Sequence, residues 1–166
     1  MAIPIERINQ PIKVEGPYFE TPLVTLPGTH ITTAYASGDA LGTQFEIEVP
    51  QSGSIQTIHV TDMSAATGIA LDILLFSEPI TQTTDDAAMD MADADRAKYK
   101  GVLKVAASEY AAMADNCVAT TPNVGVAYTA PRGKLICQCV SRGTHTLVAL
   151  TDLAVKLVII PATFEK

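Results

Sequence analysis

The chain has 166 residues and a mass of 17.6 kDa, which is the size of a single domain. Eighteen acidic residues against eleven basic ones give a net charge of −7. Because no cluster of Lys and Arg is present, the sequence excludes nucleic acid and anionic membrane as partners. The hydrophobic fraction is 48% although aromatic residues make up only 5% and Trp is absent. The core is therefore expected to consist of Val, Ile, Leu and Ala, with part of the apolar surface covered by a partner.

Residues 1–30 differ from the rest of the chain because prolines recur at short intervals, at positions 4, 11, 17, 22 and 27. Prolines at this density exclude helix interiors and central strands, so we expect an extended arm. The arm is too apolar for a solvated tail. Its candidate interaction residues are Ile3, Ile5, Ile8, Ile12, Tyr18 and Phe19. Contact with another chain and packing along its own domain are equally compatible with this pattern.

From residue 31 onward, apolar and polar residues alternate with a period of two, as in Phe45, Ile47 and Val49. This pattern predicts one all-β domain over 31–166, a jelly-roll-like sandwich of about eight strands. The clearest predicted strands are 43–49, 54–62, 68–76, 100–107, 124–129, 134–140 and 153–160. The strand at 68–76 is apolar on both faces and is therefore expected to be central.

Two segments interrupt the β pattern. Residues 83–86 read Thr-Thr-Asp-Asp, which are helix N-cap residues, and 87–99 are rich in Ala, Met, Asp and Lys. We expect one or two short helical turns there, and another at 108–113.

The three cysteines are Cys117, Cys137 and Cys139. An odd number of cysteines, with no signal peptide at the start of the chain, predicts free thiols in a reducing cytoplasm. Cys137 and Cys139 share one face of a predicted strand, which favours buried hydrophobic packing over a metal or redox pair.

The sequence predicts no catalytic residue, metal site or cofactor. Aspartates 85, 86, 90, 93 and 95 form the best candidate for calcium, but their spacing lacks the Gly and bidentate Glu of a calcium loop, which favours a solvated helix face. The three histidines, His30, His59 and His145, are not paired in any short motif. No nucleophile turn or phosphate-binding loop is present.

Several short motifs occur in an order that characterises a known family. They are AYASGDALG at 34–42, FEIEV at 45–49, SIQTIHVTD at 54–62, ALDILLF at 70–76, DMADAD at 90–95, AASEY at 106–110, ADN at 114–116 and SRGT at 141–144. Together they resemble the small virion structural proteins of tailed bacteriophages that are similar to jelly-roll capsid cement, or decoration, proteins. The resemblance covers about 34–160 and excludes the arm.

The resemblance implies a protein made in the host cytoplasm that binds the outside of the shell formed by the major capsid protein. It also implies self-association, with a homodimer favoured over a trimer. Two alternatives remain at this stage. One is a phage tail, baseplate or receptor-binding module. The other is a cupin-like metalloenzyme, for which His30, His59 and His145 would be the first residues to test.

Overall fold

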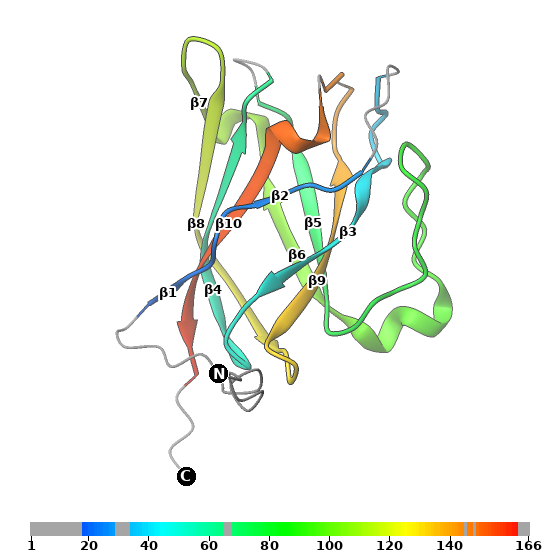
Figure 1. Ribbon diagram of the computed structural model, residues 1–166, viewed down its shortest axis with the longest axis vertical. Helices are drawn as coiled ribbons and strands as arrows, with labels where there is room; N and C mark the ends of the chain where they lie inside the picture. Colours follow the sequence, from blue (N-terminus) through cyan, green and yellow to red (C-terminus); the bar gives the residue numbers. More distant parts are fainter. Residues whose placement is uncertain (1–17, 29–33, 65–67, 145, 148, 163–166) are drawn as a thin grey trace, which may run out of the picture.

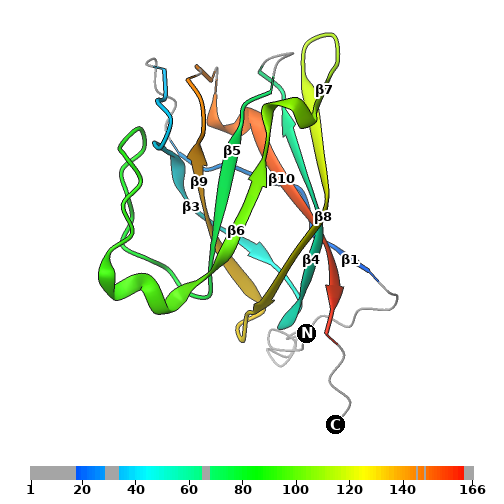
Figure 2. The same ribbon diagram turned by 180° about the vertical axis from the view of Figure 1, so that it is seen from behind.

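The computed structural model describes residues 18–28, 34–64, 68–144, 146–147 and 149–162, which form a sandwich of two antiparallel sheets (Figures 1 and 2). The predicted all-β sandwich is therefore confirmed. The strands are β1 (Phe19–Glu20), β2 (Val24–Thr25), β3 (Ala40–Glu48), β4 (Ser52–Asp62), β5 (Leu71–Phe76), β6 (Tyr99–Val105), β7 (Tyr110–Ala112), β8 (Cys117–Thr129), β9 (Lys134–Ser141) and β10 (Leu153–Pro161). Within the described residues, three 3₁₀ helices join them: η2 (Asp93–Lys98), η3 (Ala107–Glu109) and η4 (Leu150–Asp152).

One sheet has six strands in the order β1-β10-β4-β8-β7, with β2 also paired to β10, and the other has four in the order β3-β9-β5-β6. The core lies between them, where alternate residues of both sheets meet. Ile47 of β3, Ile58 of β4 and Leu157 of β10 are all fully buried there. This packing follows from the period-two pattern, because every second side chain of a strand points to the same face.

Strand β5 is central, as its sequence predicts, because it pairs with β6 on one side and β9 on the other. Its inward residues join the main core. Outward-pointing Leu74 and Phe76 belong to a second apolar cluster, together with Ile80 and Ile136. Residues 77–98, which we call the crossover, cover this outer face on their way from β5 to β6 (Figure 1).

The predicted helical turns are present as 3₁₀ helices whose bounds differ from the prediction, and one predicted strand begins earlier than expected. The crossover contains η2, and its earlier part forms an isolated bridge between Ala88 and Asp39, the residue before β3. The helical turn predicted at 108–113 is η3 followed by strand β7. Strand β8 begins at Cys117 rather than at 124, because a bulge opposite residues 55–57 of β4 accommodates Pro122 and Gly125 without ending the strand.

Residues 18–28, which we call the strap, lie along β10 and then reach β3. Phe19 pairs with Ile159, and Val24 pairs with Val155. Farther along, the Leu26 N–H donates to the Leu153 carbonyl, and Thr43 of β3 donates its N–H to the Pro27 carbonyl at 3.0 Å. The strap thus bridges the edges of the two sheets, and this part of the predicted arm packs on its own domain. Residues 1–17 lie outside the described residues.

The strap comes so close to β3 that only glycine fits at position 42. Gly42 has a φ of +65°, and a Cβ built there would lie 2.3 Å from the Pro27 carbonyl oxygen. A larger residue would have to push the strap away from the sheet edge.

We therefore expect Gly42→Ala to lower the free energy of unfolding by about 2–4 kcal/mol, from left-handed backbone strain together with overpacking. Urea denaturation monitored by circular dichroism measures this loss. The control is Gly143→Ala, because a Cβ there meets nothing within 4 Å. It should change the stability by no more than about 0.5 kcal/mol. Equal stability of the two variants would contradict the tight contact.

Candidate functional site

Of the six candidate interaction residues, the structure describes Tyr18 and Phe19. Tyr18 has 60% of its surface exposed and is available to a partner. Phe19 instead packs against the core from its place opposite Ile159. Ile3, Ile5, Ile8 and Ile12 lie outside the described residues, so their predicted role stays a prediction.

The strap holds Tyr18 at a fixed place through paired hydrogen bonds with β10. The Thr21 N–H donates to the Leu157 carbonyl, and the Leu157 N–H donates to the Thr21 hydroxyl, both at 3.0 Å. The Thr21 hydroxyl in turn donates to the Pro22 carbonyl at 3.0 Å. Thr21 is buried, so this pair is shielded from water. Tyr18 directly precedes β1, which pairs with the C-terminal part of β10 at Val158 and Ile159 (Figure 1).

Two of the five clustered aspartates have structural roles in the crossover. The Asp85 carboxylate accepts hydrogen bonds from the Tyr35 hydroxyl at 3.0 Å and from the Gly42 N–H at 2.8 Å. Asp95 is buried and accepts from the Thr81 N–H and from the Lys98 ammonium group. The hydrogen bond from Lys98, followed by that from Thr81, lowers the pKa of Asp95. For Asp95, the predicted solvated helix face is therefore wrong.

The other aspartates of this cluster do not converge. Asp93 forms an exposed ion pair with Arg96, three residues later, and Asp90 bonds to Thr83 through its backbone. In the part of the chain that the structure describes, no group of three or more His, Cys, Asp or Glu side chains could hold a metal ion.

Of the histidines, only His59 is described, and its Nδ1 lies 3.0 Å from the hydroxyl oxygen of Thr120 on the neighbouring strand. It sits on the outer surface of the six-stranded sheet. His30 and His145 fall outside the described residues.

All three cysteines are free and fully buried, as the sequence predicts. Burial raises the pKa of the thiols of Cys117, Cys137 and Cys139 above the ordinary value. A raised pKa reduces the thiolate fraction, and burial blocks access to reagents, so these thiols are unreactive in the folded protein.

The buried side chain of Asp62 lies at the end of β4. The Asp62 carboxylate accepts hydrogen bonds from the Ser64 N–H and hydroxyl, while its Oδ2 atom has no hydrogen-bond partner. The buried Tyr110 hydroxyl also lacks a hydrogen-bond partner. Burial, followed by the nearby Cys117 and Asp62, raises the pKa of Tyr110, so the phenol stays protonated. The Asp62 and Tyr110 side chains therefore provide no activated nucleophile or base.

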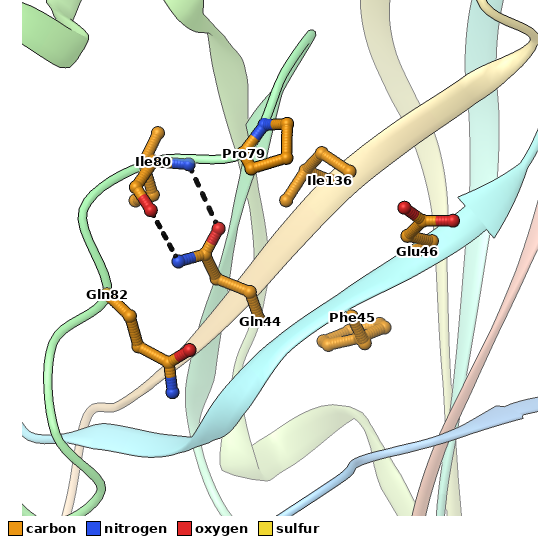
Figure 3. Close-up of a pocket in the computed structure, with 7 residues that line it drawn as sticks. All are labelled: Gln44, Phe45, Glu46, Pro79, Ile80, Gln82 and Ile136. Carbon is orange, nitrogen blue, oxygen red and sulfur yellow. Dashed lines mark hydrogen bonds between the residues drawn. The ribbon is translucent and has the colours of Figure 1, made fainter.

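The surface is hollowed between β3 and the start of the crossover, where a volume of about 340 Å³ is open to solvent (Figure 3). The Gln44 amide is hydrogen-bonded to the backbone at this site, because it donates to the Ile80 carbonyl and accepts from the Ile80 N–H. Glu46 lies farther along β3 and pairs with Lys134 at 2.6 Å. Pro79, Ile80 and Ile136 supply apolar walls. The hollow offers apolar contact and one paired carboxylate but no nucleophile.

Comparison with known proteins adds no assignment: neither the protein-family models nor the curated proteins include a match to this chain. No helix within the described residues is long and apolar enough to cross a membrane.

We expect the three thiols to resist a thiol reagent such as Ellman's in the native protein and to react fully after denaturation in guanidinium. The physical reason is the combination of burial and raised pKa. Absorbance of the released chromophore counts the thiols per chain. Stoichiometric reaction within minutes under native conditions would contradict the buried placement.

The buried Asp95 predicts an acid-sensitive contribution to stability. Because its pKa is lowered in the folded state, this contribution is present above the unfolded pKa and is lost as the pH falls through the folded pKa. At pH 7 we expect Asp95→Asn to melt at a lower temperature than the natural protein. The difference should begin to shrink below about pH 4, where the unfolded chain takes up the proton, and should shrink further as the folded state follows at lower pH.

Differential scanning calorimetry from pH 3 to pH 7 measures this convergence. Asp93→Asn serves as the control, because the Asp93–Arg96 pair is exposed and should contribute little at any pH. A difference between Asp95→Asn and the natural protein that does not depend on pH would contradict the ion-paired state.

Proposed function

We propose that this chain is a structural protein of a tailed bacteriophage virion, a capsid cement protein that binds the outside of the shell and stabilises it. It acts by contact rather than by catalysis, and its main partner is the major capsid protein. The resemblance of residues 34–160 to this family supports the proposal, and the all-β sandwich is compatible with it. The way the strap attaches the N-terminal segment to the domain carries the mechanical part of the argument.

The strap forms a connection suited to bearing load. Its hydrogen bonds to Ile159, Leu157 and Leu153 run along one strand of the core sheet, and the Pro27 carbonyl then bonds to Thr43 of the other sheet. Several backbone hydrogen bonds therefore attach the strap to both sheets. A rigid domain with a firmly attached segment is what a clamp between coat subunits requires.

The N-terminal segment has the composition of a docking element. Residues 1–17 contain four isoleucines and three prolines. Proline restricts the free chain, so less conformational entropy is lost when the segment becomes ordered on a surface. Burying each isoleucine against a coat subunit would contribute about 1.5–3 kcal/mol before ordering costs. Many copies per shell would multiply this contribution.

The test is deletion of residues 1–17, a boundary that spares β1 and the strap. We expect the shortened protein to melt within about 2–4 °C of the full chain, the shift that roughly 1 kcal/mol causes in a domain of this size. Its binding to shells assembled from the major coat protein of the same genome should be lost. Co-sedimentation with the shells measures binding, and calorimetry measures melting.

The matched variant replaces Ile3, Ile5, Ile8 and Ile12 by serine while keeping the length and the prolines. It should also fail to bind if apolar burial drives docking. Unchanged binding by both variants would contradict the clamp. Failure of the full chain itself to bind shells, together with binding to tails, would favour the tail-module alternative over a capsid protein.

A further inference from the structure

The two sheets have very different outer faces. The outer face of the four-stranded sheet carries charged side chains, among them Glu46, Lys134 and Asp72, and the crossover covers part of it. The outer face of the six-stranded sheet has none of the described chain lying over it (Figures 1 and 2). We call this second surface the bare face and define it as the outward-pointing residues of β10, β4 and β8 with their edge strands.

The bare face is almost free of charge. At its centre, β4 presents Thr57, His59 and Thr61, because Ile58, Val60 and Asp62 point into the core. The neighbouring strands present Thr120 of β8, opposite His59, and Val158 of β10, opposite Thr57. Exposed sheet faces of soluble proteins usually carry polar and charged residues. Loss of charge from a surface is instead a property of interface centres.

The charges that do point outward from the described strands of this sheet neutralise each other. They are Lys156 of β10 and Glu20 of β1, and the two form an ion pair within the chain. A partner covering the bare face would therefore not bury an uncompensated charge, which is the costly event in forming an interface. It would also cover Ile160, an exposed apolar residue at the end of β10.

We propose that the bare face is the contact surface for a second copy of this chain, with the two six-stranded sheets packed face to face about a two-fold axis. Each chain carries a net charge of −7, so two copies repel each other unless they meet where acidic residues are absent or paired. The bare face meets that condition. A two-fold contact also uses the same patch on both subunits, so a flat, uncharged patch of small and β-branched residues is self-complementary.

The size of the bare face suits a stable dimer. Strand β4 has 11 residues, which at about 3.4 Å per residue makes the face roughly 37 Å long. Four strand spacings of about 4.8 Å make it roughly 19 Å wide, which corresponds to a flat area on the order of 700 Å². A standard interface buries about 800 Å² on each partner, and side-chain relief adds to the flat value.

The first experiment is light scattering of the purified full chain at micromolar concentration. We expect a mass twice the 17.6 kDa of one chain. Thr120→Glu places an exposed carboxylate on β8 of the bare face, opposite His59 at its centre, and should raise the concentration needed for dimerisation at least tenfold. Thr144→Glu adds the same charge at an exposed position in the loop after β9 and should leave the dimer intact.

The second experiment does not require a disruptive variant. Because all three natural cysteines are buried, a thiol introduced by Thr120→Cys or by Thr144→Cys is the one that a maleimide reaches. Labelling at position 120 should slow at least tenfold as the protein concentration rises through the dimerisation range, while labelling at position 144 should stay constant.

Three outcomes would overturn the proposal. The first is a natural protein that stays at 17.6 kDa at all concentrations. The second is a dimer unaffected by Thr120→Glu with equal labelling at both positions, since this would place the contact elsewhere. The third is a monomer whose binding to shells is lost in Thr120→Glu, since the bare face would then serve the coat protein. The proposal does not rest on the capsid function, because a dimer that ignores shells would support it and contradict only the cement assignment.

Discussion

The backbone hydrogen bonds between the strap and β10 close the side of the sandwich on which both sheets would otherwise end in unpaired edges. Unpaired edges invite pairing with other chains. Here β10 is covered by two short strands that contain or adjoin proline, and the Pro27 carbonyl joins them to β3. On the opposite side, β6 lies against β8, and a Cβ at Gly101 would come within 3.0 Å of the Val126 side chain. With both sides closed, contacts with other molecules are directed toward faces and ends rather than edges.

This closure also explains how a small domain accommodates so many apolar residues. The main core takes the inward residues of both sheets. The crossover adds a second apolar layer over β5 and β9, in which Phe76, Ile80 and Ile136 are buried and Met89 and Met91 pack beside them. Val158 and Ile160 of β10 lie outside both layers, on the bare face. The apolar fraction is therefore divided between two covered layers and one uncovered surface.

Much of the fold follows from residue patterns, and the deviations have identifiable physical causes. The alternation of apolar and polar residues predicts β4. Apolar residues on both faces, interrupted only by Asp72, predict that β5 is central, because a central strand is buried on both faces. One or two short helical turns were expected in the crossover, and η2 is such a turn. In the earlier part of the crossover the methionines instead pack on the outer apolar layer, and Asp85 accepts hydrogen bonds from the Tyr35 hydroxyl and from the Gly42 N–H of β3. Tertiary contacts of this kind outweigh local propensity.

Hydrogen bonds between residues far apart in the chain could not be predicted from the sequence, because they too depend on tertiary contacts. Nothing local at Thr21 indicates that its hydroxyl accepts a hydrogen bond from Leu157, which lies 136 residues away in the chain. The bare face could have been recognised in part, since residues 54–62 contain no Lys or Arg and their one acid, Asp62, falls on the inward side of the alternation. Its uncharged neighbours on β8 and β10 emerge only from the sheet register.

The acidic residues are unevenly distributed over the surface of the domain. Asp62, Asp72 and Asp95 are buried or nearly so and accept hydrogen bonds within the domain, so a net charge of −7 does not describe a uniformly acidic surface. Exposed acids such as Glu46 and Glu48 lie on β3, away from the six-stranded sheet. Repulsion between copies therefore depends strongly on orientation. It is weakest when the bare faces meet and stronger for approaches through the four-stranded sheet. Charge placement alone would favour one relative orientation of two copies before any specific contact forms.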